Sequence, residues 1–170
     1  MVANSFGCHL AVELAVRHPH RVHALILTGP TATPASSGLP ALLTRWAMTA
    51  LREPTDVVPL ALRDLRRSGI RHAAAQLREG RRYPLARRLA QVSAPTLVVR
   101  GQQDHLAPAR WSRHLASIAR RGRLVHVPGA HMLPYERPRL VADLVDMADA
   151  VTPSGRRGAG TVGHDRRAGS

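Results

Sequence analysis

The chain opens on a serine that lies between small residues, at the point where a short strand gives way to a helix. Residues Ala3–Gly7 follow the pattern small-x-Ser-x-Gly, and small neighbours are needed because bulky ones would clash with the following helix. Ser5 would sit on strained backbone at such a turn, with the N-terminus of the helix turned towards it. Ser5 is therefore a candidate nucleophile, although most serines in glycine-containing turns serve only the turn. Helical spacing is seen directly behind it, in Cys8, Ala11, Val12, Ala15 and Val16.

Short apolar segments that end in turns alternate with helical patterns in two parts of the chain. Residues 22–27 form a nearly continuous apolar run that ends in Thr28-Gly29-Pro30, which is typical of a strand buried on both faces of a parallel sheet. Similar strands are expected at 95–99 and 124–127, with helices from Pro108 to Gly122 and over 138–151. This alternation predicts an α/β fold with a mostly parallel sheet and flanking helices. We assign residues 1–30 and 92–151 to this core.

Residues 31–91 interrupt the alternation with arginine-rich helical segments. Helices are expected from Leu39 to before Pro54, from residue 55 or 56 to a Gly69 cap, from 71 to 79 with Gly80 as its cap, and briefly after Pro84. The apolar stripe of the second helix is expected to face inward: Val58, Ala61, Leu62 and Leu65. We interpret this block as a helical insertion over the edge of the sheet, where a lid over a substrate pocket would lie. Ordinary helical packing without a gating role is the alternative.

Composition narrows the classes of function. The formal charge of +14 suggests nucleic acid as a partner, but all 25 basic residues are arginine and aromatic residues make up only 3% of the chain. A whole-chain compositional bias explains this better than a stacking groove for nucleic acid. A single cysteine excludes an internal disulfide and a multi-cysteine metal site.

The remaining expectations follow from the same composition. No apolar run reaches the roughly 20 residues that span a bilayer. We therefore expect a cytoplasmic protein that holds no metal and has neither nucleic acid nor membrane as a partner. The oligomeric state stays open. Residues 152–170 are rich in glycine and arginine and are expected to form a disordered basic tail.

Two polar residues follow predicted strands, as Ser5 does. Asp104 comes after the strand at 95–99 and a glycine turn, and His131 comes after the strand at 124–127. Sites in open α/β sheets lie at the carboxyl ends of strands, so these three side chains are expected near one another. Serine needs an imidazole to take its proton and a carboxylate to orient that imidazole. Taken singly, Asp104 could be a turn former and His131 is one of ten histidines.

Other polar residues near these positions have simpler explanations. Cys8 is expected to be a small packing residue and not a second nucleophile. His9 could line the pocket, although a solvated helix position is the favoured interpretation. Glu136, Asp143 and Asp146 are placed in the predicted last helix, where a solvated face or a charge at the helix start explains them.

Together these motifs resemble the serine branch of the α/β-hydrolase fold family, in which nucleophile, acid and histidine follow in that order. The resemblance implies that Ser5 is the nucleophile, Asp104 the orienting acid and His131 the base, with the N–H of Phe6 as an oxyanion donor. It covers Met1 to about Ala150. It rests on Asn4–Gly7 at the elbow, Pro95–Val99 with Gly101 and Asp104 at the acid, and Pro128–His131 with Glu136–Pro138 at the histidine.

The resemblance also implies strands before the elbow, and a loop after the third of them that supplies a second oxyanion donor. Because the chain starts at the elbow strand, we expect a partial hydrolase fold that lacks its N-terminal strands, as the C-terminal part of a longer enzyme. Loss of one donor costs on the order of 10²–10³ in turnover, so weak or absent activity is expected.

The predicted function, which the resemblance implies, is hydrolysis of an ester-like bond in a small-molecule substrate through an acyl-enzyme on Ser5, with no cofactor. The segment Asn4–Gly7 also resembles the elbow of carbon–carbon hydrolases that act on ring-cleavage products, which makes such a reaction the first alternative. A non-catalytic hydrolase remnant or binding module is the second. The substrate stays open, because the insertion and the loops before the elbow would shape its pocket.

Overall fold

A computed structural model describes residues 1–31 and 39–151 of the chain. Its strands form one four-stranded sheet in the order β1-β2-β3-β4, and each neighbouring pair is parallel. Because all four strands run the same way, their carboxyl ends lie together at one end of the sheet. The residues that follow each strand are therefore neighbours in space. The bounds are β1 (Val2–Asn4), β2 (Leu25–Thr28), β3 (Thr96–Gly101) and β4 (Gly122–Val127).

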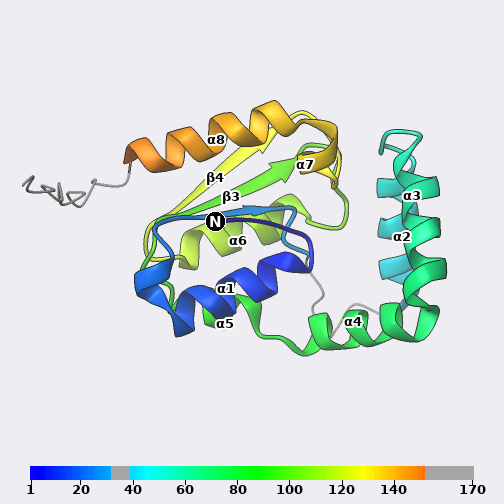
Figure 1. The fold of residues 1–170 in the computed structure, drawn as a ribbon, viewed down its shortest axis with the longest axis horizontal. Coiled ribbons are helices and arrows are strands. Elements are labelled where there is room, and N and C mark those ends of the chain that lie inside the picture. Colours follow the sequence, from blue (N-terminus) through cyan, green and yellow to red (C-terminus); the bar gives the residue numbers. More distant parts are fainter. Residues whose placement is uncertain (32–38, 152–170) are drawn as a thin grey trace, which may run out of the picture.

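Helices cover both faces of this sheet (Figure 1). One face carries α1 (Gly7–Arg17), α5 (Leu85–Leu89) and α6 (Ala109–Ile118), and the other carries α8 (Pro138–Val151). On β2, Leu25 and Leu27 pack into the buried cluster under α1, while Ile26 packs into the cluster under α8. This alternation is what a strand buried on both faces requires. The predicted α/β class, parallel sheet and flanking helices are confirmed.

Some boundaries differ from those predicted. Strand β2 begins at Leu25 and not at residue 22, since its pairing with β3 starts at Leu25 opposite Thr96; the 3₁₀ turn η1 (Pro19–Arg21) lies in the connection after α1. Helix α6 ends at Ile118, and Gly122 begins β4 where we expected it to end the helix. Gly122 passes so close to the end of α6 that a Cβ atom on it would lie 2.0 Å from the carbonyl oxygen of Ala116. The absence of a side chain at Gly122 therefore allows the chain to pass close to α6 as it enters β4.

The insertion forms three longer helices: α2 (Leu39–Ala50), α3 (Val57–Ser68) and α4 (Ile70–Arg82). Figure 1 shows α2 and α3 standing beyond the carboxyl end of β3, with α4 returning the chain towards α5. This arrangement brings the insertion to the same end of the sheet as the turns that follow the strands.

Two predictions within the insertion are wrong. Leu62 and Leu65 were expected to face inward, but they are 47% and 37% exposed. Helical spacing shows which residues share a face, whereas tertiary packing decides whether another element covers that face. Gly80 does not cap a helix, because α4 continues to Arg82. Its missing side chain instead lets α4 approach His9, since a Cβ atom on Gly80 would lie 3.3 Å from His9 Cε1.

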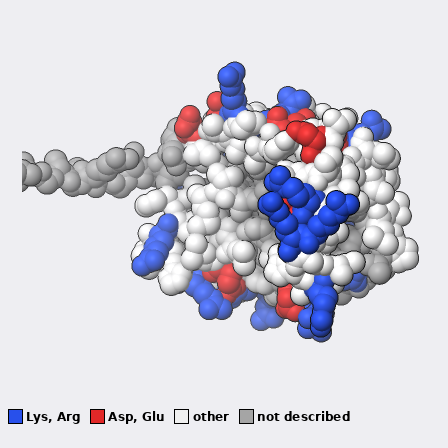
Figure 2. All heavy atoms as spheres, turned by 45° about the vertical axis from the view of Figure 1, so that its right-hand side comes forward, with Lys and Arg blue, Asp and Glu red and all other residues white. Residues whose placement is uncertain are grey.

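Charged side chains are spread over the outside of the molecule. Figure 2 shows basic side chains at many points of the visible face, with acidic side chains among them. Among the helices of the described ranges, none combines the length and apolar character needed to cross a bilayer. The predicted disordered tail, residues 152–170, lies outside the described residues.

Candidate active site

Ser5 occupies a sharp turn between β1 and α1. Its φ angle is 53°, the one positive value among the described residues that are not glycine. Its N–H donates to the carbonyl oxygen of Thr28 at 3.1 Å, and its own carbonyl accepts from the N–H of Cys8 at 3.1 Å. Residues other than glycine rarely adopt this conformation, and such strain is concentrated at functional positions. The predicted strained strand-to-helix turn is confirmed.

Asp104 and His131 form a buried pair. Asp104 Oδ2 lies 2.8 Å from His131 Nδ1, and the two residues are 0% and 6% exposed. The other carboxylate oxygen, Oδ1, accepts from the N–H groups of Leu106 at 2.8 Å and Ala107 at 2.9 Å. This orientation of the carboxylate suits the His131 tautomer in which Nδ1–H donates to Asp104, and in that tautomer Nε2 carries no proton.

A pocket of about 540 Å³ brings Ser5 and His131 together. No hydrogen bond joins their side chains within the described part of the chain. In structures without substrate, the hydrogen bond between a nucleophile and its base is often long or not yet formed. The pocket walls come from α1, α2, α4 and three connecting segments, and they are mainly apolar: Phe6, His9, Thr31, Leu42, Leu43, Trp46, Ala73, Gln76, Leu77, Gly80 and Leu106.

Gly29, directly after β2, packs against the Asp–His pair. Its φ angle is 51°, and a Cβ atom on it would lie 2.8 Å from His131 Nδ1 and 2.9 Å from Asp104 Oδ2. Glycine is therefore required at this position for two reasons, the backbone conformation and the space taken by the pair. The sequence marked Gly29 only as the end of a strand, because its contact with residues 75 or more positions away depends on the fold.

Carboxylates also hold the backbone of the loop that carries His131. Glu136 lies in the short helix α7 (Leu133–Glu136), and its Oε2 accepts from the N–H of Ala130 at 3.1 Å. Glu136 was expected in the last helix, on a solvated face or as a charge at the helix start; it lies instead in α7, before α8 begins, and its carboxylate accepts from the loop that carries His131. Glu53, from the insertion, accepts from the N–H of His131 at 2.7 Å and from that of Met132 at 3.0 Å. Burial raises the pKa of Glu53.

The neighbouring His9 differs from the favoured prediction. It is 4% exposed, and it stacks on Tyr83 with ring centroids 5.2 Å apart while its edge meets Phe6 at 5.3 Å. Burial lowers the pKa of His9, which favours its neutral form. The insertion supplies this cover, which helical periodicity in α1 alone could not reveal.

Cys8 serves packing, as predicted. Its side chain is fully buried, and its thiol donates to the carbonyl oxygens of Ala3 at 3.5 Å and Thr28 at 3.6 Å. Burial raises the pKa of the thiol, so a reactive thiolate is disfavoured. Among the described residues, no group of three or more His, Cys, Asp and Glu side chains is placed to hold a metal ion.

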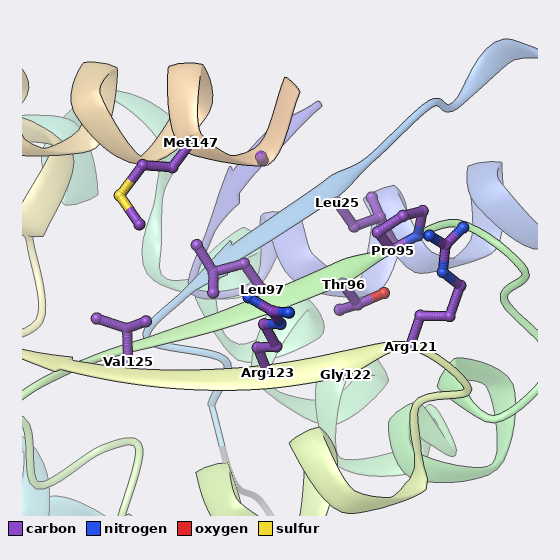
Figure 3. A pocket seen from close by; sticks show the side chains of 10 residues that line it. Leu25, Pro95, Thr96, Leu97, Arg121, Gly122, Arg123, Val125 and Met147 are labelled. Carbon is purple, nitrogen blue, oxygen red and sulfur yellow. The ribbon is translucent and has the colours of Figure 1, made fainter. Parts of the chain in front are cut away.

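A second hollow, of about 330 Å³, lies at the opposite end of the sheet (Figure 3). It is formed by the first residues of β2, β3 and β4 together with α8. Ser5, Asp104 and His131 are not among its lining residues, so it is not the candidate active site. Those lining residues are Leu25, Pro95, Thr96, Leu97, Arg121, Gly122, Arg123, Val125, Met147 and Ala148.

The fold agrees with comparisons to known proteins. The sequence model of the Alpha/beta hydrolase family matches residues 1–144, and the chain belongs to this family. Its four-stranded sheet and flanking helices form part of the α/β-hydrolase fold.

Two enzymes from Pseudomonas are similar to this chain in sequence. The chain is 30% identical to 2-hydroxymuconate semialdehyde hydrolase from Pseudomonas sp. (strain CF600) over 91% of its own length and 64% of that protein. It is 31% identical to the enzyme of the same name from Pseudomonas putida over 89% of its own length and 63% of that protein. The chain therefore spans just under two thirds of the length of these relatives.

Solved structures share the fold. Est816, described as an N-acyl homoserine lactone degrading enzyme, has a TM-score of 0.68 and 20% identity, over 86% of this chain and 65% of that chain. The meta-cleavage product hydrolase CumD from Pseudomonas fluorescens IP01 has a TM-score of 0.60 and 22% identity, over 88% of this chain and 63% of that chain.

Proposed function

We propose that this chain carries the catalytic groups of a serine hydrolase that cleaves an ester-like bond in a small molecule. The observation that carries the proposal is the buried contact of 2.8 Å between His131 Nδ1 and Asp104 Oδ2, in a histidine that shares its pocket with Ser5. A serine on a strained turn beside an oriented imidazole is the arrangement that acyl transfer needs.

The proposed reaction has two stages. Nε2 of His131 takes the proton of Ser5 Oγ as this oxygen attacks the substrate carbonyl, and Asp104 stabilises the imidazolium that forms. The tetrahedral intermediate then expels the alcohol, which receives the proton from His131. Water, activated in the same way, attacks the acyl-enzyme and releases the acid together with free Ser5.

The oxyanion of the intermediate would form beside the start of α1. Phe6 is the N-cap residue of this helix, so its N–H lies outside the helical hydrogen-bond ladder and can donate to an oxyanion. The apolar pocket wall favours a substrate with an apolar acyl or alkyl group. We further propose that α2 and α4, which supply much of this wall, act as a lid over the substrate.

A carbon–carbon hydrolase is the second candidate. It is favoured by the 30% and 31% identity to proteins named 2-hydroxymuconate semialdehyde hydrolase, and by the elbow Asn4–Gly7. In that reaction the same pocket would take a ring-cleavage product in place of an ester. The catalytic groups are shared, so the substrate alone separates the two proposals.

Turnover of two substrate classes tests the proposal. The 170-residue chain and its Ser5→Ala variant are compared with p-nitrophenyl esters of increasing chain length and with 2-hydroxymuconate semialdehyde. Ser5-dependent release of p-nitrophenol supports the esterase, and faster Ser5-dependent loss of the semialdehyde supports the second candidate. If neither the folded chain nor a chain extended at its N-terminus to the length of the relatives turns over either substrate, the non-catalytic interpretation takes the place of both.

A further inference from the structure

The last turn of α2 and the connection from it to α3 contact both loops that carry the candidate acid and base. Thr49 Oγ1 accepts a hydrogen bond at 3.2 Å from the N–H of His105, the residue after Asp104. Four residues later, Glu53 Oε1 accepts from the backbone N–H groups of His131 at 2.7 Å and Met132 at 3.0 Å. One short segment of the insertion thus holds the backbone of the acid loop and of the histidine loop.

A third contact lies at the end of the same segment. The hydroxyl of Tyr135, in α7, donates a hydrogen bond to Oδ2 of Asp56. We call Thr49, Glu53 and Asp56 the insertion clamp. In Figure 1 the turn between α2 and α3 lies on the side of the insertion that faces α7, in agreement with these contacts.

Glu53 is the member of the clamp that touches His131 itself. Its Oε2 is buried and has no hydrogen-bond partner within the described residues. The two hydrogen bonds accepted by Oε1 therefore have to offset the cost of burying the Glu53 carboxylate. Hydrogen bonds from N–H groups to a carboxylate are stronger than those between neutral groups. Two such bonds orient the peptide groups before and after His131. The loop is held from its other side by Glu136, which accepts from Ala130.

We propose that Glu53 is a positioning residue for His131. Through Glu53, the position of the helical insertion determines the orientation of the imidazole. This inference rests on the proposed function, because it assigns Glu53 a role in the reaction of Ser5. The two hydrogen bonds to Glu53 fix the backbone position of His131, and the contact with Asp104 fixes Nδ1 of its ring. Nε2 is then held in one place relative to the pocket.

Kinetics of Glu53→Ala and Glu53→Gln test this role. Because small misplacement of a catalytic group can cost about 10²-fold, kcat of Glu53→Ala is expected to fall by about that factor with KM little changed. Glu53→Gln keeps a side-chain oxygen that can accept both N–H groups, so it is expected to retain most of the turnover. Glu79→Ala, which removes an exposed carboxylate on α4, is the matched control and is expected to behave as wild type.

Amide hydrogen exchange measured by NMR gives a second readout that does not depend on activity. In the wild-type chain the amides of His131 and Met132 are expected to be protected. In Glu53→Ala they should exchange about five- to tenfold faster, the factor that corresponds to loss of one hydrogen bond, and Glu53→Gln should restore protection. Unprotected amides in the wild type, or equal kcat in Glu53→Ala and wild type, overturn the inference.

The two readouts also separate this inference from the proposed function. If Ser5→Ala retains full activity, the serine mechanism fails. Protection of the His131 and Met132 amides in the wild-type chain would then show that Glu53 only holds the loop, and its role in positioning a catalytic base would be refuted. If activity depends on Ser5 but not on Glu53, the proposed function stands and the positioning role is refuted.

Discussion

The imidazole of His131 is oriented by Asp104, whose carboxylate lies 2.8 Å from Nδ1 and is fully buried. A buried carboxylate is costly unless it is hydrogen-bonded, and Asp104 meets this need through His131 and two backbone N–H groups of its own loop.

Asp104→Asn is expected to abolish most turnover without unfolding the chain. The amide keeps the volume of the carboxylate, but it removes the charge that stabilises the imidazolium and can select the wrong tautomer of His131. In another serine hydrolase the equivalent change lowers kcat by about 10⁴-fold, and a loss of that order is expected here. Ester hydrolysis and thermal unfolding of both proteins measure it. A variant that turns over at the wild-type rate would contradict the role of Asp104.

Gly29→Ala tests the packing against the Asp–His pair. The added methyl group would lie within 3 Å of both side chains and would also meet an unfavourable φ angle, so a loss of about 1–3 kcal/mol in the free energy of unfolding is expected. Turnover should fall as well, because the pair must move. Gly69→Ala is the matched control, since Gly69 has a φ of 82° but nothing within 4 Å of the added Cβ.

The two glycines separate backbone strain from contact with the site. If both alanine variants lose stability equally and keep their activity, Gly29 serves the backbone conformation alone. Loss of activity in Gly29→Ala but not in Gly69→Ala supports the packing argument. Urea unfolding together with kcat of each variant provides the comparison.

Glu13 links α1 to α5 and makes stability depend on pH. Arg88 donates to it at 2.8 and 2.9 Å, Arg17 at 2.6 Å and Tyr83 at 2.9 Å. These hydrogen bonds, Arg88 first, lower the pKa of Glu13 from 4.5 to about 2. A carboxyl group with a lowered pKa in the folded state contributes stability that is present above pH 4.5 and is lost as the pH falls towards 2.

Glu13→Gln should therefore be less stable than wild type near pH 7, and the difference should narrow as the pH falls. Urea unfolding at several values between pH 7 and pH 3 measures it. A difference that stays constant over this range would show that Glu13 contributes through packing of its side chain and not through its charge.

The sequence predicted the core better than the insertion. Helix α8 has the predicted bounds, Pro138–Val151, because its apolar residues repeat at helical spacing and lie against a sheet. Ser5, Asp104 and His131 could be singled out because each follows a strand, and the ends of parallel strands meet at one end of the sheet. The same reasoning gave a wrong prediction of burial for Leu62 and Leu65, since periodicity identifies the apolar face of a helix without showing what covers it.

Residues whose role depends on distant contacts were not found. Glu53 lies in a connection between helices and contacts a loop 78 positions later, so no local pattern distinguishes it from a solvated charge. Gly29 is read as a strand end in the sequence, and its contact with the Asp–His pair arises only when β2 and β3 are side by side. His9 is buried only because the insertion returns over α1.

Labelling with a fluorophosphonate tests the central claim most directly, since this reagent phosphonylates activated serines whatever their natural substrate. The 170-residue chain and Ser5→Ala, both shown to be folded by circular dichroism, are treated with the probe and analysed by intact mass and peptide mapping. The account predicts one adduct on the wild-type chain, mapped to Ser5 and absent from the variant. Labelling of the wild-type chain at a residue other than Ser5, or equal labelling of Ser5→Ala, would contradict it.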